Sequence, residues 1–526
     1  MKELSELEKL KASRNPLRVI DDIYKEALEG IPLKEEYIGL LKWYGMYPHV
    51  NKDNLEDKKY FMKRIKIVDA RMNLEQLKVI AQIGVDYAKG YVDFTTRQNV
   101  QYHYIEIKDL PTIFDLLNSA GLTSRMASGD GPRPIMTCPV SGIDENEIYD
   151  VREILKDVDS YFDKNDDEFC NFPRKYKMGV SGCGSHCANH EIQDLAFTAF
   201  KTKDGEVLFD ITLGGGLSKS KQIATRINKY ATKEQVRDVA VAVANIFRDN
   251  GNRDSRSKAR IRHLLNDWGV LKFVDEIEKE IGYTLQDGFD EPNITPSEKR
   301  NHFGINAQSN GKFYIGFATN AGRVEGEKLV KIYEICKKYG VGGVALTATQ
   351  NFLIYDIDKD FVENIASEVE ALGFPYKNST FKARLQSCTG KEFCKFGITE
   401  TKEYVRNIAD ILEEKIKDFD EEITIAFSGC THACSQPQIS DIGLIGCLMR
   451  DEDGNRVEGY EIFFGGNLQG TSSTLAQKIG VKVTAVKVVD YLVGLVEEYQ
   501  QRDDFNTFKE YLNSKIYSAN EENPTE

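Results

Sequence analysis

The sequence contains no long apolar run. No stretch approaches the length needed to cross a bilayer, and the N-terminal segment MKELSELEKLKASRNPLRVI is charged throughout, without the apolar core of a signal peptide. We therefore expect a cytoplasmic protein with no membrane partner. In that reducing compartment the ten cysteines are not expected to form disulfides, which turns attention to metal chemistry.

Positive charge is also in short supply. The chain has 69 Lys and Arg residues against 83 Asp and Glu residues, which gives a net charge of −14. No basic cluster is interleaved with aromatic residues, so this balance argues against nucleic acid as the main partner. A local cationic site for a small anion is compatible with it.

Nucleotide-binding fingerprints are absent as well. The glycine loops at 214–216 and 465–466 lack the required spacing, although each could cradle an anion if a helix followed it. No flavin or nicotinamide motif is visible, so we expect electrons for any redox chemistry to arrive from a separate protein. The 526 residues, 41% of them hydrophobic and 29% charged, predict a globular chain of roughly three or four domains.

The chain does contain an internal duplication. The segment TTRQN at 95–99 is repeated as TATQN at 347–351, at an offset of 252 (347 − 95), and the same offset carries Phe61 onto Phe313. Each copy reads as a strand, an amphipathic helix and a paired strand. This pattern predicts a small α+β sandwich in each half.

A second correspondence has an offset of 247. SGCGSHC at 181–187 matches SGCTHAC at 428–434, and each copy later has a strand followed by a glycine loop and an expected helix. These segments predict an α/β unit in each half. Residues 1–58 lie outside the recognised repeat and are expected to be helical, and 230–300 is interpreted as a charged, largely helical connector.

Four cysteines of the second half form two closely spaced pairs. They are Cys388 and Cys394 in CTGKEFC, and Cys430 and Cys434 in SGCTHAC. Two such pairs favour an iron–sulfur cluster, with structural zinc and inert buried thiols as the alternatives. His432, and His186 in the matching segment, are interpreted as loop histidines bonded to backbone, with ligation as the alternative.

The remaining cysteines are divided into two groups. Cys336 and Cys447 stand alone and are predicted to be core residues. Four thiols of the first half could bind a second cluster: Cys138, Cys170, Cys183 and Cys187. The alternative is that Cys138, Cys183 and Cys187, which sit at repeat-equivalent positions, are relics of the duplication.

Several cations occur only in the first half. Arg64 aligns with Gly316 and Arg97 with Thr349, and Lys175 and Lys177 would share one side of an extended segment. The first-half set is Arg64, Arg97, Arg133, Arg174, Lys175 and Lys177. For any single member the ordinary interpretation is a solvated side chain. Together they suggest that one half supplies positive charge to a central site while the other half holds a redox cofactor.

The motifs resemble the ferredoxin-dependent nitrite/sulfite reductases, the family that carries sirohaem and a [4Fe-4S] cluster. FMKRIK, TTRQN, GPRP, NFPRKYK, CTGKEFC and SGCTHAC occur in family order over residues 58–500. The resemblance implies an internally duplicated α+β fold, with ferredoxin-like repeats and two α/β cofactor-binding domains around a central sirohaem. The expected units are an N-terminal helical extension 1–58, repeats 59–130 and 301–382, and α/β domains 131–300 and 383–526.

The same resemblance assigns roles to residues. Cys388, Cys394, Cys430 and Cys434 would bind the cluster, and Cys434 would also bridge it to the sirohaem iron. Arg64, Arg133, Lys175 and Lys177 would hold the oxyanion substrate and assist its protonation. Arg97 would pair with sirohaem carboxylates, and Thr95, Gln98 and Asn99 belong to the same cofactor-binding segment.

The expected reaction is the six-electron reduction of sulfite to sulfide with electrons from ferredoxin. Lys177 favours sulfite, because plant-type nitrite reductases have asparagine there and a dianion gains more from a second ammonium group. Nitrite reduction to ammonia is the alternative, followed by a non-catalytic sirohaem or iron–sulfur protein and a zinc-stabilised structural protein. Cys183 and Cys187 depart from the plant enzymes. We also expect a basic patch near the cluster for the acidic donor, and a monomer.

Overall fold

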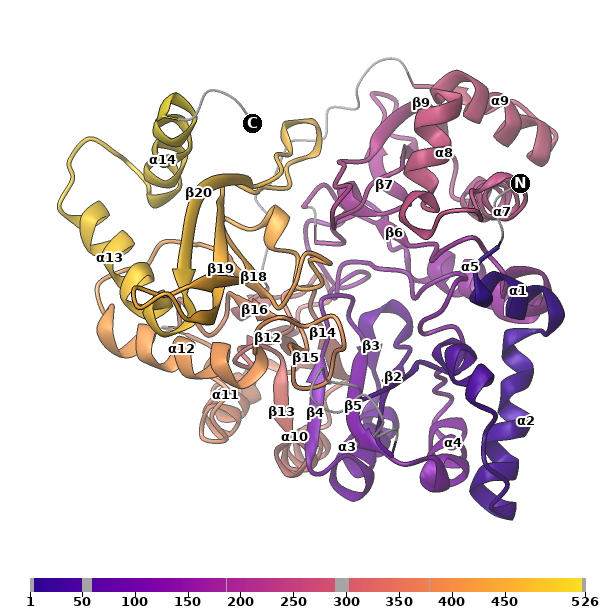
Figure 1. The fold of residues 1–526 in the computed structure, drawn as a ribbon, viewed down its shortest axis with the longest axis horizontal. Helices are drawn as coiled ribbons and strands as arrows, with labels where there is room; N and C mark the ends of the chain where they lie inside the picture. Colours follow the sequence, from indigo (N-terminus) through magenta and orange to yellow (C-terminus); the bar gives the residue numbers. More distant parts are fainter. Residues whose placement is uncertain (1–3, 50–58, 186, 289–301, 378, 523–526) are drawn as a thin grey trace.

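The computed structural model describes residues 4–49, 59–185, 187–288, 302–377 and 379–522, and it confirms the predicted duplicated α+β fold. The described part of the chain contains four five-stranded sheets. Two of them lie side by side in the lower centre of Figure 1, and the other two lie above them to the left and right.

The two lower sheets are built from the repeated strand–helix–strand units. Their orders are β1-β2-β5-β4-β13 and β11-β12-β15-β14-β3. The strands are β1 (Met46–Pro48), β2 (Phe61–Ile65), β3 (Arg71–Met72), β4 (Tyr91–Phe94), β5 (Val100–Ile105), β11 (Gly304–Ala307), β12 (Phe313–Phe317), β13 (Arg323–Glu325), β14 (Gly343–Leu346) and β15 (Phe352–Ile357). Each half lends the other an edge strand, since β13 pairs with β4 and β3 pairs with β14. The exchange ties the halves together.

The helices of these units bury their apolar faces in one shared core. They are α3 (Leu74–Tyr87), α4 (Leu110–Ser119), α10 (Gly326–Tyr339) and α11 (Val362–Glu370). Helix α3 begins at a capping box formed by Asn73 and Gln76. It packs tightly on α10, because a Cβ atom added to Gly326 would lie only 3.0 Å from the backbone nitrogen of Val85. The two repeats therefore fold as one hydrophobic body.

The third sheet, at the upper right of Figure 1, carries the first cysteine motif. Its order is β10-β9-β8-β7-β6, and only the β6–β7 pair is parallel. The strands are β6 (Met178–Ser181), β7 (Leu195–Lys201), β8 (Val207–Leu213), β9 (Thr225–Ala231) and β10 (Gln286–Asp287). It packs against helices α5 (Arg152–Lys164), α7 (Gln235–Asn250), α8 (Ile261–Trp268) and α9 (Val270–Ile281).

The interpretation of residues 230–300 as a connector is wrong for the part that the structure describes. Helix α7 buries Val236, Val239, Val243 and Phe247 in the core of the third sheet. Its charged residues lie on the opposite face, as expected for an amphipathic helix. Charge alone did not distinguish a linker from a helix that covers a sheet.

The fourth sheet, at the left of Figure 1, carries the second cysteine motif. Its order is β16-β17-β18-β19-β20, with β16, β17 and β18 parallel. The strands are β16 (Leu385–Ser387), β17 (Ile425–Ser428), β18 (Ile442–Arg450), β19 (Arg456–Phe464) and β20 (Gln477–Thr484). Helices α12 (Lys402–Lys415), α13 (Val488–Gln500) and α14 (Phe508–Glu522) contribute to its core.

The N-terminal segment is mostly helical, as predicted, but its end belongs to the repeat. It contains α1 (Glu6–Ser13), α2 (Val19–Tyr24), a π-helical turn (Lys25–Glu29) and a 3-10 stretch (Glu35–Tyr44). Strand β1 then pairs with β2, as β11 pairs with β12 in the second half. The sequence comparison missed this strand because its spacing from β2 differs between the halves.

The glycine loops do not open α-helices, which corrects a second expectation. After β8 the chain folds back through a bridge between Gly216 and Gln222 and enters β9. After β19 there is only a three-residue 3-10 turn, Gly470–Ser472. Neither loop therefore offers a helix N-terminus to an anion. Among the described residues, no helix is long and apolar enough to cross a membrane.

Candidate active site

The four predicted cluster cysteines come together at the carboxyl ends of β16 and β17. Cys388 directly follows β16, and Cys430 lies two residues beyond β17. Because neighbouring parallel strands end at the same edge, their loops meet there. Cys430 interacts electrostatically with Cys434, Cys388 and Cys394. The structure thus gathers all four thiols from two loops that the sequence separates by a helix.

The spacing of these thiols suits a cluster better than a single ion. No three of the four sulfur atoms, all in described residues, lie within 4.8 Å of one another. Ligands of one tetrahedral zinc ion lie roughly 3.5–4 Å apart, given metal–ligand bonds of about 2.0–2.3 Å. The backbone N–H of Gly429 donates to Cys388 Sγ at 3.2 Å, a type of contact that stabilises cluster thiolates. The zinc alternative for this quartet is therefore disfavoured.

Of the two predicted substrate lysines, Lys175 interacts with Cys434 of the second cysteine loop, and Lys177 lies next to Lys175. Burial, followed by Arg260 and Arg133, lowers the pKa of Lys175 to about 7, while the charge of Cys434 opposes that shift. Burial and then Lys175 lower the pKa of Lys177 well below its usual value. Within the described chain neither Nζ atom has a hydrogen-bond or ion-pair partner. Two such amines in one recess favour an anionic ligand between them.

Arg133 and Arg64 line the same region with part of their hydrogen-bonding capacity used. Arg133 Nη1 donates to the carbonyl of Ala127 at 2.9 Å. The pKa of Arg133 is lowered to about 10, mainly by burial. Arg64 donates to Gln101 Oε1 at 3.2 Å, while its Nε is buried without a partner. These guanidinium groups are held in position by protein acceptors and retain charge for a ligand.

Arg97 occupies the turn between β4 and β5. Its Nη1 donates to Gln193 Oε1 at 2.8 Å and its Nη2 to the carbonyl of Pro134 at 2.8 Å, but its Nε is buried without a partner. Burial, followed by the charge of Arg133, lowers its pKa to about 9. A carboxylate at this position would satisfy the Nε and restore the charge balance.

The neighbours of Arg97 in the TTRQN turn bond to protein groups. Gln98 Nε2 donates to the carbonyl of Thr137 at 2.8 Å, and Asn99 Oδ1 accepts from the backbone N–H of Ile67 at 3.1 Å. Thr95 Oγ1 accepts from the backbone N–H of Asn99. These contacts of Thr95, Gln98 and Asn99 shape the turn that carries Arg97, and their assignment to cofactor binding stays a prediction.

Thr96 connects this turn to the other half. Its hydroxyl donates to the carbonyl of Cys434 at 3.2 Å, across a sequence separation of 338 residues. The contact brings the cation-bearing turn and the predicted bridging cysteine to one place. The sequence identified both segments, and only the fold showed that they touch.

Two further arginines were missed by the sequence analysis. Arg260 donates to Asp194 Oδ1 through Nε at 2.9 Å and Nη2 at 2.8 Å. Arg262 is buried with no partner for Nε or Nη1, and burial, followed by Arg260, lowers its pKa to about 10. The alternating basic run RSKARIR at 256–262 was the available signal, but it lies outside the recognised repeat.

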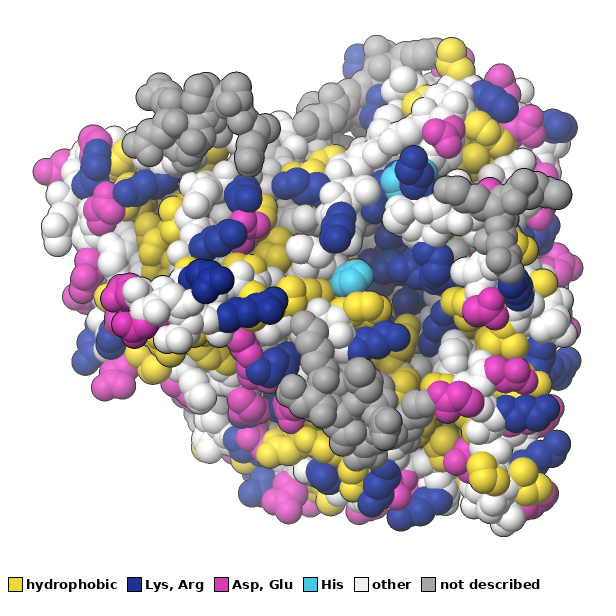
Figure 2. Space-filling model, viewed as in Figure 1, with side chains coloured by type: hydrophobic (Ala, Val, Ile, Leu, Met, Phe, Trp, Pro, Cys, Tyr) yellow, Lys and Arg dark blue, Asp and Glu magenta, His cyan; other side chains and the backbone are white. Residues whose placement is uncertain are grey.

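The cationic groups without hydrogen-bond partners in the described chain test whether this region fits sirohaem, a tetrapyrrole rich in carboxylates. Among the described residues, Arg64, Arg97 and Arg262 of this region have buried guanidinium nitrogens without a hydrogen-bond partner, and the amines of Lys175 and Lys177 are unpaired. Burying charge without a counter-ion is costly. The donor set therefore fits a polyanionic ligand. Figure 2 shows Lys and Arg side chains gathered in a hollow near the centre of this face, beside a histidine.

The N-terminal helix supports one wall of this region through Asp130. Asp130 accepts from Arg256 at 2.9 and 3.0 Å and from Lys11 of α1 at 3.4 Å. Burial alone would raise the pKa of this carboxyl, but Lys42 and Arg256 lower it well below its usual value. Asp130 lies three residues before Arg133, so this network anchors the GPRP loop.

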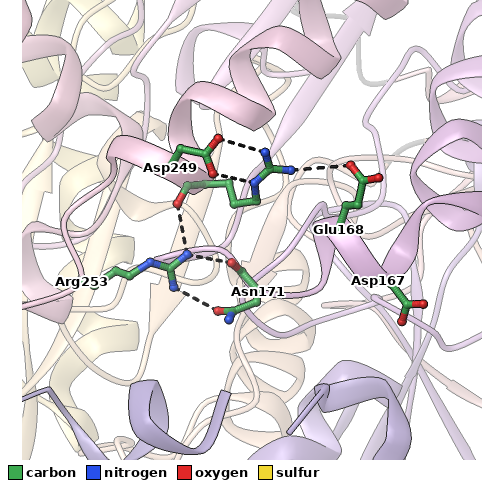
Figure 3. Close-up of a pocket in the computed structure, with 6 residues that line it drawn as sticks. Asp167, Glu168, Asn171, Asp249 and Arg253 are labelled. Atoms are coloured by element: carbon green, nitrogen blue, oxygen red, sulfur yellow. Dashed lines mark hydrogen bonds and ion pairs between the residues drawn. The ribbon is translucent and has the colours of Figure 1, made fainter. Parts of the chain in front are cut away.

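A separate surface pocket of about 510 Å³ is lined by Asp167, Glu168, Asn171, Arg248, Asp249 and Arg253. Most of its polar groups already have partners: Arg248 pairs with Asp249 and Glu168, and Arg253 bonds to Asn171, as the dashed lines of Figure 3 mark. Arg253 also binds Glu8 of α1 at 2.9 Å. We interpret this pocket as a junction that attaches the N-terminal helix.

The remaining cysteines separate clearly in space. Cys336 is fully buried in α10, as predicted for a core residue, whereas Cys447 is only partly buried. Cys170 bonds to Asn15 Oδ1 at 3.5 Å and lies in the core of the first repeat. It is not part of the first-half thiol group, in which Cys138 and Cys187 are joined by His302. His186 lies outside the described residues, and His432 Nδ1 lies 3.3 Å from Cys430 Sγ.

Comparisons with known proteins agree with this geometry. The family model described as "Nitrite and sulphite reductase 4Fe-4S domain" matches residues 128–285 and 381–514. The model described as "Nitrite/Sulfite reductase ferredoxin-like half domain" matches 54–120 and 306–372. These four ranges include most strands of each of the four sheets.

Individual relatives align over nearly the full length. "Sulfite reductase [ferredoxin] 1" of Mycolicibacterium paratuberculosis is 32% identical over 96% of this chain and 94% of the relative. "Assimilatory ferredoxin-dependent nitrite reductase" of Haloferax mediterranei is 31% identical over 93% of this chain and 88% of the relative. The solved Mycobacterium tuberculosis NirA protein superposes with a TM-score of 0.91 at 30% identity, covering 98% of each chain.

Proposed function

The chain belongs to the nitrite and sulphite reductase family, and on that premise we propose that it reduces sulfite to sulfide with six electrons taken from ferredoxin. The family carries sirohaem and a [4Fe-4S] cluster, which together supply the metal centre that passes electrons to the substrate. We place the reaction in the cytoplasm and in a monomer. Nitrite reduction to ammonia is the second candidate, because relatives named for each anion match about equally well.

The chain's own residues divide the work between the halves. Cys388, Cys394, Cys430 and Cys434 would hold the cluster, with Cys434 also serving the sirohaem iron. Arg97, Arg260 and Arg262 would pair with sirohaem carboxylates. In the described chain Arg97 and Arg262 have guanidinium N–H groups without an acceptor, and Arg260 is held in place by Asp194.

Arg64, Arg133, Lys175 and Lys177 would bind the substrate anion. A positively charged recess polarises the bonds from sulfur or nitrogen to oxygen as oxygen is lost as water. A lysine with a depressed pKa is also a better proton donor than an ordinary lysine. Lys175 and Lys177 therefore both orient the anion and deliver protons.

One observation carries the proposal: Lys177 lies beside Lys175, and Lys175 interacts with Cys434, the cysteine predicted to bridge the cofactors. The direct test is steady-state turnover of the reconstituted holoenzyme with sulfite and with nitrite, using reduced ferredoxin as donor. We expect turnover of both, with the larger kcat/KM for sulfite. A holoenzyme with full cofactor content and no turnover of either anion would contradict the proposal.

Lys177 is the expected specificity residue. Its backbone N–H is held by Asp194 Oδ2 at 2.9 Å, so the side chain is directed by a fixed backbone. Lys177→Asn should reduce kcat/KM for sulfite more than for nitrite, because the dianion loses more Coulomb energy. Lys201→Asn, at an exposed position of β7, is the matched control. An equal loss for both anions would remove Lys177 from substrate selection.

A basic surface near the cluster fits the expected donor. Lys395 is exposed beside Cys394, and the nearby Phe396 is 54% exposed and packs against His432. Exposed apolar and cationic groups over a redox centre suit a transient acidic partner. Lys395→Glu should raise the KM for ferredoxin and weaken its salt dependence, while Lys272→Glu on α9 should not. An unchanged salt dependence would place the docking surface elsewhere.

A further inference from the structure

The first half contains a buried group of metal-ligand side chains at the position equivalent to the predicted cluster site of the second half. Cys138 Sγ lies 3.4 Å from His302 Nε2, and Cys187 Sγ lies 3.2 Å from the same nitrogen. The ligand atoms of these three buried residues all lie within 4.8 Å of one another. It is the one such group in the described part of the chain.

The histidine is oriented for ligation. His302 Nδ1 lies 3.3 Å from the hydroxyl of Tyr314 on β12. A partner at one ring nitrogen holds the other toward a metal, as outer hydrogen bonds do in established sites. His302 Nε2 therefore faces both thiols.

A third thiol, Cys183, lies beside this group, although its sulfur is not among the three ligand atoms that all lie within 4.8 Å of one another. Cys183 and Cys138 are hydrogen-bonding partners. Cys183 and Cys187 correspond to Cys430 and Cys434 in the repeat, and Cys138 follows the segment equivalent to β16 through its bridge between Met136 and Gly179. Three thiols and one imidazole are a standard ligand set for structural zinc.

The distances distinguish a single ion from a cluster. With zinc–sulfur bonds of about 2.3 Å and zinc–nitrogen bonds of about 2.0–2.1 Å, tetrahedral sulfur and nitrogen ligands lie roughly 3.5 Å apart. The two measured sulfur–nitrogen distances are 3.4 and 3.2 Å. The four thiols of the second half contain no group of three this close. Two thiols and the imidazole of the first half are therefore spaced for a single ion, and Cys183 would move toward them to act as the fourth ligand.

We propose that Cys138, Cys183, Cys187 and His302 bind one tetrahedral zinc ion. The site is closed, because Cys138 and Cys187 lie in an apolar cluster with Val140, Ile143 and Leu353. Substrate has no access to such a site, so the ion is structural. This inference does not depend on the choice between sulfite and nitrite.

The ion would fasten the first cysteine loop to the second repeat. His302 contacts Tyr314 of β12, whereas Cys187 lies two residues before Asn189, which donates to Gln436 Oε1 at 2.9 Å. Gln436 in turn lies two residues after Cys434. A metal ion bound at Cys187 would thus stabilise the contact between the two cysteine loops, which lies next to the proposed cofactor site.

The first test is the metal content of the full-length holoenzyme, purified without a metal-binding tag and washed with chelator. Mass spectrometry of the elements should find about one zinc per chain in addition to the iron of sirohaem and one cluster. Absence of zinc would overturn the proposal. Extra iron with the spectrum of a second cluster would overturn it too.

Variants locate the ion. His302→Ala and Cys187→Ser should each reduce bound zinc at least about tenfold, since loss of one ligand breaks a four-coordinate site. Cys336→Ser, which changes a buried thiol of α10, should retain zinc. Zinc retained by His302→Ala would refute this ligand set.

X-ray absorption at the zinc edge of the unmodified protein keeps the proposal testable if the variants do not fold. We expect three sulfur ligands at about 2.3 Å and one nitrogen at about 2.0 Å. A shell of oxygen and nitrogen ligands only would show adventitious surface zinc and would overturn the assignment.

Discussion

The two halves of the molecule keep the same scaffold and differ in the side chains that face the centre. Lys177 and Thr424 occupy equivalent positions, and the backbone N–H of each donates to an equivalent aspartate, Asp194 at 2.9 Å and Asp441 at 2.7 Å. The backbone contact is shared, while an amine is present in one half and a hydroxyl in the other.

The TTRQN turns show the same division. Gln98 donates to the carbonyl of Leu346, and Gln350 donates reciprocally to the carbonyl of Phe94. The residue before each glutamine differs. Arg97 has an Nε without a partner among the described residues, whereas the equivalent Thr349 forms a 2.8 Å hydrogen bond with Thr347. Groups that satisfy backbone are retained in both halves, because losing them leaves buried polar atoms unpaired. Groups that are proposed to face the cofactor have diverged.

The largest effect is expected at Cys434, which is proposed to bridge the cofactors, whereas the equivalent Cys187 is proposed to bind zinc. Cys434→Ala should abolish turnover and change the visible and paramagnetic spectra, because it would remove a ligand shared by two redox centres. Cys447→Ala, in the same sheet, is the control and should retain both. Normal turnover of the Cys434 variant would show that the bridging role lies elsewhere.

The lysines come next. Lys175→Met and Lys177→Thr, the second copying the other half, should each lower kcat by about 10²–10⁴-fold, as expected for removal of a general acid. Sirohaem and iron contents should be unchanged. A loss below about tenfold in both variants would reassign proton delivery to other groups.

Exchanging the turn residue between the halves tests the cofactor role of Arg97. Arg97→Thr removes a charge-assisted contact worth about 1.5–3 kcal/mol, so sirohaem should bind roughly ten- to hundredfold more weakly. Spectroscopic titration of the apoprotein with sirohaem measures this. The reciprocal change, Thr349→Arg, should not restore sirohaem binding when it is added to Arg97→Thr. Thr349 is hydrogen-bonded to Thr347 and Asn351, so its position faces protein groups. Undiminished affinity in Arg97→Thr would assign the carboxylates to other cations.

The pH profile sharpens the role of Lys175. In the role proposed for Lys175 the amine acts only when charged, so kcat/KM should fall as pH rises through its pKa, which is about 7 before ligands bind and is raised by bound anions. Nitrite is the better probe, since it remains an anion throughout this range. The alkaline limb should begin at or above pH 7 and should be lost in Lys175→Arg. A limb that persists in that variant would arise from another group.

The smallest effect concerns the shared scaffold. Gln98→Leu and Gln350→Leu each leave buried backbone groups unpaired and should lower the free energy of unfolding by about 1–3 kcal/mol. Because their contacts are equivalent, the two losses should agree within about 1 kcal/mol. Denaturant unfolding of the apoprotein measures both. A large difference would show that the halves are not energetically equivalent.

Much of this molecule could be predicted from local sequence. The thiol pairs, the TTRQN repeat and the Lys-x-Lys segment are short-range patterns, and their chemistry depends on spacing within a few residues. Arg260 and His302 could not be found in this way. The partner of Arg260 is 66 residues away, and Cys187 lies 115 residues from His302.

The sequence by itself determined the duplication, the thiol quartet and the confinement of particular cations to one half, because each is written in contiguous residues. The tertiary structure decided which side chains meet. It exchanged edge strands between the halves, brought Thr96 to Cys434 and closed a second thiol group with a distant histidine. The physical reason is that burial and strand pairing join segments irrespective of their separation in the chain, whereas sequence patterns report only neighbours.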